Sequence, residues 1–176
     1  ARAREDLLEA EELTLLARRP HRAAAAQPGE VAPSDSRPLA RRALADEVAV
    51  FASASEGFSR SNLNCSIAES FARFRPVAEA AAAANVRMRG YVSCVVECPY
   101  DGPVAPEAVA DVVAGLFAIG AYEVSLGDTI GKGEPPTVAA MLDAVLGVAE
   151  AGRLAGHFHD TGGRALANVE AALAKG

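Results

Sequence analysis

Short apolar runs alternate along the chain with longer segments in which apolar residues recur at helical spacing. The apolar runs predict four strands, at 47–52, 86–96, 121–126 and 154–159. The strands begin roughly 30 to 40 residues apart, which matches consecutive βαβ units. Strands that alternate with helices in this way predict a parallel sheet with helices on its outer face.

The segments between the strands carry start and stop signals for helices. Ser66 and Glu69 have the spacing of a capping box ahead of an apolar-periodic stretch. Pro106 suits the first turn of a helix that Gly120 ends. Four helices are predicted on such signals, at 66–85, 106–120, 135–152 and 164–175.

The repeated units favour a barrel over a doubly wound sheet. Gly127, Gly131 and Gly133 share one loop after a strand, but GDTIGKG does not have the G-x-G-x-x-G spacing of a dinucleotide-binding turn. A complete (β/α)₈ barrel typically needs about 250 residues. We therefore expect an α/β fold, a partial (β/α)₈ TIM barrel of about four βα units. Because open sheet edges are normally covered or closed, the chain is either a fragment or is completed by another chain.

The N-terminal part follows a different pattern. Residues 5–19 could form an amphipathic helix, whereas 20–42 are rich in Arg, Ala, Pro and Ser and read as loop or disorder. The chain is thus divided into an irregular, partly helical segment at 1–46 and a partial barrel domain at 47–176. A basic arm for an acidic partner is the less favoured interpretation of the Arg-rich stretch.

Composition excludes several classes of partner. The formal net charge of −6 and the pI of about 5.1 argue against nucleic-acid binding, which needs clustered basic residues. No apolar run is long enough to span a bilayer, and no secretory signal is expected. Three cysteines without a signal suggest reduced thiols. We expect a cytoplasmic protein, or a mitochondrial matrix protein if the source is eukaryotic.

His157 and His159 are the sharpest chemical signal. They lie two apart in a predicted strand, so both side chains point to one face while Phe158 points toward the helices. They also end that strand, where a parallel barrel carries its catalytic residues. Two imidazoles on one face suit a divalent metal, and Asp160 could orient a ligand or cap the next helix. The alternative is two histidines that only form hydrogen bonds inside the barrel.

Asp128 is the second candidate, because it ends an apolar strand ahead of Thr129 and a glycine-rich loop. A carboxylate there can accept a proton or hold a substrate hydroxyl. It can also cap a turn, which is slightly favoured when the residue is taken alone. Ser93, Cys94 and Cys98 surround the end of the second strand; a thiol there could act on a substrate or metal, but buried Cys is more often inert packing.

Asn62 and Asn64 are predicted to lie in a polar loop after the first strand, at the same end of the sheet. They could bind substrate or serve turn geometry.

Five segments resemble the 3-hydroxy-3-methylglutaryl-CoA lyase family in order and spacing. They are DEVAVFASASE (46–56), NLNCSIAES (62–70), RGYVSCVVECPY (89–100), YEVSLGDTIG (122–131) and HFHDTGGRALAN (157–168). HxHD alone is shared by a wider superfamily of metal-dependent barrels, which includes isopropylmalate and homocitrate synthases and the pyruvate and oxaloacetate carboxyltransferases. GYVSCV with CPY, followed by SLGDTIG, is far more specific to the lyase.

The resemblance implies cleavage of 3-hydroxy-3-methylglutaryl-CoA to acetyl-CoA and acetoacetate, a step of leucine degradation and ketone body formation. It implies Mg²⁺ or Mn²⁺ as cofactor, with His157 and His159 as ligands and Asp128 as the catalytic residue. It implies a small acyl-CoA substrate and a possible homodimer as partners, and neither nucleic acid nor membrane. Substrate contacts are assigned to Asn62, Ser93, Ser125 and Thr129.

The chain also departs from the family pattern. The family's first-strand Arg–Asp pair, its last-strand Asn ligand and its later loop with the catalytic Cys have no counterpart in this sequence. Cys98 belongs to an earlier CPY and is not assigned that catalytic role, and Glu97 replaces the small residue expected before it. A reading-frame error between about His21 and Ala45 would explain the missing strand there. We therefore expect little turnover from this chain alone, and two alternatives stay open: a non-catalytic fragment, or a related carboxyltransferase or synthase.

Overall fold

A computed structural model of the protein describes residues 46–176. The helix predicted at 5–19 and the irregular stretch predicted at 20–42 lie outside this range. Within 46–176, no helix combines the length and the apolar character that crossing a membrane requires.

Four strands form one sheet, and every neighbouring pair in it is parallel. Their order across the sheet, β1-β2-β5-β6, follows their order in the chain. This confirms the predicted succession of βα units. The strands are β1 (Glu47–Ser53), β2 (Arg87–Ser93), β5 (Glu123–Asp128) and β6 (Leu154–Phe158).

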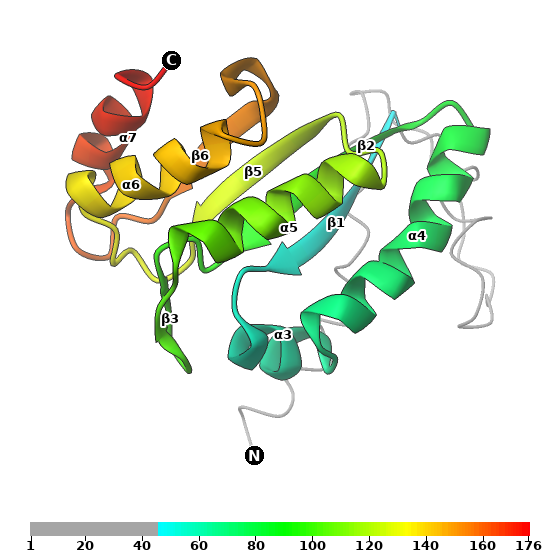
Figure 1. Ribbon diagram of the computed structural model, residues 1–176, viewed down its shortest axis with the longest axis horizontal. Helices are drawn as coiled ribbons and strands as arrows, with labels where there is room; N and C mark the ends of the chain where they lie inside the picture. Colours follow the sequence, from blue (N-terminus) through cyan, green and yellow to red (C-terminus); the bar gives the residue numbers. More distant parts are fainter. Residues whose placement is uncertain (1–45) are drawn as a thin grey trace, which may run out of the picture.

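The helices α4 to α7 lie over one face of this sheet, and α3 lies beyond the carboxyl end of β1 (Figure 1). The capping box is confirmed: the Ser66 hydroxyl accepts from the Glu69 N–H at 3.2 Å, and the Glu69 carboxylate accepts from the Ser66 N–H at 2.7 Å. The helices are α3 (Glu56–Leu63), α4 (Ile67–Ala83), α5 (Pro106–Ala118), α6 (Pro135–Leu146) and α7 (Ala165–Leu173), with a 3₁₀ turn, η1 (Ala151–Arg153), before β6.

Alternate strand residues form the core between sheet and helices. Val50 pairs with Gly90, and Gly90 pairs with Val124, so these positions share one face. At Gly90 an added Cβ would come within 3.0 Å of Leu116 in α5, which identifies that face as the helix-covered one. The intervening residues therefore face the opposite side, which corresponds to a barrel interior.

Several features differ from the sequence prediction, among them the end of α6 at Leu146 instead of residue 152. The helix α3 and a two-stranded ribbon, β3 (Glu97–Cys98) with β4 (Gly102–Pro103), were not predicted. The strand β2 ends at Ser93, not at residue 96, because Cys94 adopts a left-handed backbone with φ of 60°. His159 lies one residue beyond the end of β6.

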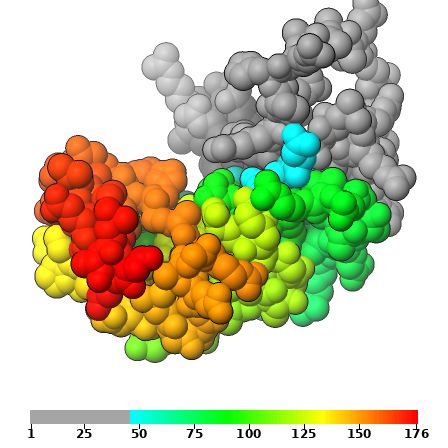
Figure 2. All heavy atoms as spheres, turned by 90° about the horizontal axis from the view of Figure 1, so that it is seen from above, coloured from blue at the N-terminus to red at the C-terminus, as the bar shows by residue number. Residues whose placement is uncertain are grey.

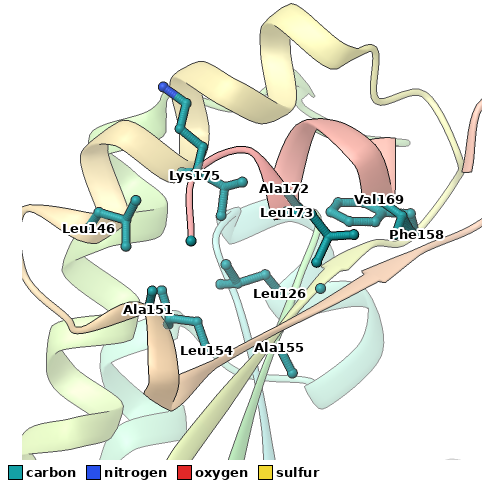
Figure 3. A pocket seen from close by; sticks show the side chains of 13 residues that line it. Leu126, Leu146, Ala151, Leu154, Ala155, Phe158, Val169, Ala172, Leu173 and Lys175 are labelled. Atoms are coloured by element: carbon teal, nitrogen blue, oxygen red, sulfur yellow. The ribbon is translucent and has the colours of Figure 1, made fainter. Parts of the chain in front are cut away.

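An apolar hollow of about 210 Å³ lies beside the sheet edge formed by β6. Leu146, Leu154 and Phe158 are among its lining side chains (Figure 3). The neighbouring helix α7 stands at one end of the molecular surface (Figure 2) and exposes Leu166 and Leu173 by 72% and 73%. This edge of the described fold is therefore its most apolar exposed region.

Candidate functional site

The two predicted histidines meet at the carboxyl end of the sheet. The Nε2 atoms of His157 and His159 are 3.1 Å apart, and their ring centroids are 5.0 Å apart. Both residues are exposed. His157 is in register with Gly127 of β5, so it faces away from the helices, while Phe158 on the other parity lines the apolar hollow. The structure thus brings both imidazoles to one side, at the end where parallel barrels carry catalytic groups.

The spacing of these nitrogens is that of a hydrogen bond between the two rings, the alternative interpretation of the pair, and it also fits two ligands of one metal ion. Octahedral Mg²⁺ has ligand bonds of about 2.1 Å, which places neighbouring ligand atoms about 3.0 Å apart. In the part of the chain that the structure describes, no third Asp, Glu, His or Cys completes a metal-binding group. Asp160 does not turn toward the rings; its Oδ1 accepts from the Ala165 N–H at 3.0 Å and caps the start of α7. These two histidines would therefore leave most ligand positions to water, substrate or other residues.

The residues beside His157 are small. Across the sheet, Ser53, Ser93, Gly127 and His157 are partners in one row at the carboxyl ends of the strands. This row therefore carries two hydroxyls and a glycine, and no large side chain, beside the imidazole of His157. Ser93, which was assigned to substrate, is half-buried within it.

The next row on the same face lies two residues closer to the amino ends of the strands. It contains Phe51, Tyr91, Ser125 and Ala155. The rings of Phe51 and Tyr91 are stacked with centroids 4.6 Å apart. Ser125 is 4% exposed and lies one row beneath His157, so it would contact a substrate only at the floor of the site.

Asp128 does not face the histidines, which corrects the prediction that these groups share one interior. It is in register with Phe158 and not with His157, and its side chain is 0% exposed. Its Oδ1 accepts from the Lys132 N–H at 3.1 Å and its Oδ2 from the Gly133 N–H at 2.8 Å. The physical reason is parity along β5: Val124, Leu126 and Asp128 all point to the helix side. The contacts match the turn-capping interpretation.

Thr129 links the ends of two strands. Its hydroxyl accepts from the Cys94 N–H at 2.8 Å, which holds Cys94 in its left-handed conformation. Such a conformation is uncommon for a residue with a Cβ. Burial raises the pKa of the Cys94 thiol to about 12. Cys94 is therefore a neutral, buried group near the site and not an ionised nucleophile.

Cys98 has the opposite environment. Burial opposes ionisation of its thiol, but a hydrogen bond from Ser55 and backbone N–H donors from Asp101 and Tyr100 together lower its pKa. The Ser55 hydroxyl lies 2.8 Å from the Cys98 sulfur. Ser55 also caps α3 by accepting from the Phe58 N–H. The thiol thus joins the ribbon to the start of α3.

Further contacts hold the ribbon beside α3. The Asp101 carboxylate accepts from the Gly57 N–H at 2.7 Å, and the Ser61 hydroxyl bonds the Tyr100 hydroxyl at 2.8 Å. The sequence analysis did not predict this ribbon at the carboxyl end of the sheet, because its two paired strands are only two residues long.

The predicted asparagine loop is in fact the end of a helix. Asn62 lies exposed in the last turn of α3, and Asn64 ends that helix with a left-handed φ of 51°. Asn64 therefore has the turn-forming role that was one of its two interpretations, while Asn62 remains a candidate for substrate contact.

Comparisons with known proteins identify the family and the fold. A family model described as HMGL-like matches residues 9–176. The chain is 59% identical over 137 residues to hydroxymethylglutaryl-CoA lyase of Pseudomonas mevalonii, covering 78% of this chain and 46% of that protein. Its fold matches a solved HMG-CoA lyase from Brucella melitensis with a TM-score of 0.78 and 64% identity, covering 80% of this chain and 50% of that one.

A third relative was solved with ligands. The HMG-CoA lyase of Acinetobacter baumannii, in complex with coenzyme A and 3-methylmalate, matches with a TM-score of 0.74 and 30% identity over 80% of this chain and 46% of that one. The chain spans about half the length of these relatives. The fold is accordingly a partial TIM barrel of this type.

Proposed function

Because this chain belongs to the HMGL-like family, we propose that it is a section of a hydroxymethylglutaryl-CoA lyase, a carbon–carbon lyase that forms acetyl-CoA and acetoacetate. The observation that carries the proposal is the pair of imidazoles with Nε2 atoms 3.1 Å apart, beside a row of small residues. The identity to named lyases, 59% and 64%, supports the substrate. Residues 47–176 form the barrel section in this proposal.

In this proposal, several described residues of the site take part in the reaction. His157 and His159 would hold Mg²⁺ or Mn²⁺ through Nε2. The ion, when bound, supplies Lewis-acid polarisation of the substrate oxygens. Ser93, two strands away from His157 in the same row, would orient a substrate oxygen by hydrogen bonding, and Gly127 between them carries no side chain. The stacked rings of Phe51 and Tyr91 keep water from entering beneath the reacting carbons.

The partners follow from the same family. The substrate is an acyl-CoA thioester, in line with the coenzyme A complex of the Acinetobacter baumannii relative, and Asn62 and Thr129 stay proposed contacts for it. Relatives of the same name are described as mitochondrial or as cytoplasmic, and we propose one of these compartments. A second copy of the chain is a proposed partner for the apolar surface of α7; a dimer in sedimentation velocity would support this, and a monomer would contradict it.

An assay of acetoacetate formation tests the proposed function. The purified chain, supplied with 3-hydroxy-3-methylglutaryl-CoA and Mg²⁺, should form product slowly, in line with the little turnover expected from this chain alone, and chelation should abolish it. His157→Ala should lower the rate at least about tenfold, since it removes a metal ligand. The control Glu170→Gln, an exposed change on α7, should leave the rate unchanged. Absence of product from the chain with either ion would favour a non-catalytic section of the lyase.

A further inference from the structure

The loop that follows β5 packs directly against the backbone of the second histidine. Gly131 in this loop has a left-handed φ of 66°. A Cβ added there would come within 2.9 Å of the His159 carbonyl oxygen and 2.8 Å of the Thr161 Cβ. Only a glycine permits this approach. The loop at 129–133 therefore supports the peptide that carries His159.

The same loop is fixed at Gly133 from two sides. Its N–H donates to Asp128, and its carbonyl accepts from the Asn168 side-chain amide at 2.9 Å. Arg164 adds a bond to the same carbonyl at 3.3 Å. Gly133 also has no room for a side chain, because a Cβ would lie 2.8 Å from Asp128 Oδ2 and 3.2 Å from Asn168 Nδ2. The backbone of this one residue thus connects β5 to α7.

Asn168 is the unusual member of this group. Its side chain is 0% exposed, and its Oδ1 is buried with no hydrogen-bond partner among the described residues. A buried acceptor without a partner is destabilising. The amide at this position is explained by its N–H donor. An apolar residue would have no unpaired oxygen, but it would leave the Gly133 carbonyl without this hydrogen bond.

We propose that Asn168 is a positioning residue for His159, acting through the Gly133 carbonyl and the 129–133 loop. Asp128 contributes to the same arrangement by accepting from the Gly133 N–H, in the preceding peptide. The two residues set where the second imidazole lies relative to the first without contacting it. This inference rests on the proposed function, because it assigns a purpose to the 3.1 Å spacing of the two rings.

Substitutions at both ends of this chain of contacts test the proposal. Asn168→Asp keeps the shape but replaces the donor with an acceptor, and Gly131→Ala places a methyl group against the His159 carbonyl. In the metal-free protein, long-range ¹H–¹⁵N spectra of the histidine rings should show a larger shift for His159 than for His157 in both variants. The Kd for Mn²⁺ should weaken about tenfold.

Controls separate positioning from general loss of structure. Glu170→Gln, on the same helix and exposed, should change neither the ring signals nor the Kd. If circular dichroism shows that Asn168→Asp does not fold, Asn168→Ser takes its place beside Gly131→Ala. Folded variants with wild-type His159 signals would overturn the proposal. If the wild-type chain binds no Mn²⁺, the proposed metal site fails, and the ring spectra of the metal-free variants still decide the positioning role.

Discussion

At the residue scale, Asp128 shows how backbone contacts separate two interpretations of one carboxylate. Each of its oxygens accepts one backbone N–H, and the side chain is buried away from the histidines. A carboxylate so placed orders a loop. A group that removes a proton from substrate would instead lie on the face that carries His157.

Asp128→Asn should therefore destabilise the fold. The amide nitrogen would face one of the two N–H donors, leaving a buried donor unpaired, which costs about 1–3 kcal/mol. Urea unfolding measures this as a decrease in the free energy of unfolding. Asp143→Asn is the matched control, because Asp143 forms only an exposed ion pair with Lys175, worth about 0–1 kcal/mol. Unfolding free energies that agree for wild type and Asp128→Asn would contradict the loop-ordering role.

The thiol of Cys94 predicts a specific pH dependence. Burial, opposed by the hydrogen bond with Thr129, raises its pKa from 9.0 to about 12. Between these values the folded chain keeps a proton that the unfolded chain has lost. The free energy of unfolding should therefore fall as pH rises above about 9, by at most about 1.4 kcal/mol per pH unit from this group.

Cys94→Ser removes this titration, so its unfolding free energy should fall less steeply from pH 9 to 10, measured with urea and a reductant. Cys98 supplies the contrast. Its pKa is lowered by hydrogen bonds that outweigh burial, so its stabilisation is present above about pH 9 and is lost as pH falls through the folded pKa. Cys98→Ser should change the slope in the opposite direction. Parallel curves for wild type and Cys94→Ser would contradict the assignment.

At the element scale, periodicity was sufficient for the regular parts of the fold. The apolar runs predicted the four parallel strands, and the capping signals predicted α4, α5, α6 and α7. The helix α3 was missed because EGFSRSNL is mostly polar and only Ser59 in it is fully buried. The strand β2 was predicted to extend too far, because its apolar run continues past Cys94. There a hydrogen bond from the Cys94 N–H to Thr129, which is distant in sequence, turns the backbone.

The candidate site was predictable to a similar degree. The shared direction of His157 and His159 was predicted from their spacing of two residues. Their ring centroids are 5.0 Å apart, although His159 lies one residue beyond the end of β6. The direction of Asp128 was also readable, since it has the parity of the buried Val124 and Leu126. The support of His159 by Gly131 and Asn168 was not readable, because it depends on how two loops from separate units pack.

Gly90 tests the packing of the sheet on α5. A side chain at this position would meet Leu116 and Val124, both 0% exposed. Gly90→Val gains strand propensity, worth at most about 1 kcal/mol, but overpacking costs about 1–3 kcal/mol. We expect a net decrease in the free energy of unfolding, measured by urea. Gly152→Ala, which has nothing within 4 Å of its added Cβ, should be close to neutral; an equal effect of both would contradict this packing.

At the scale of the whole molecule, the described fold is half of a barrel with its chemistry at one end. The sheet carries a row of small residues and an imidazole at its carboxyl edge, a stacked aromatic pair below, and an Arg89–Glu123 ion pair below that. This layering places the polar groups at the carboxyl edge of the sheet, above the aromatic pair. The chain spans about half of its relatives' length.

The most direct test of the metal site is electron spin echo spectroscopy of the chain with bound Mn²⁺. The site predicts modulation from two imidazole nitrogens in the wild-type chain and from one in either His157→Ala or His159→Ala. A spectrum without nitrogen coupling, or one that both substitutions leave unchanged, would contradict it.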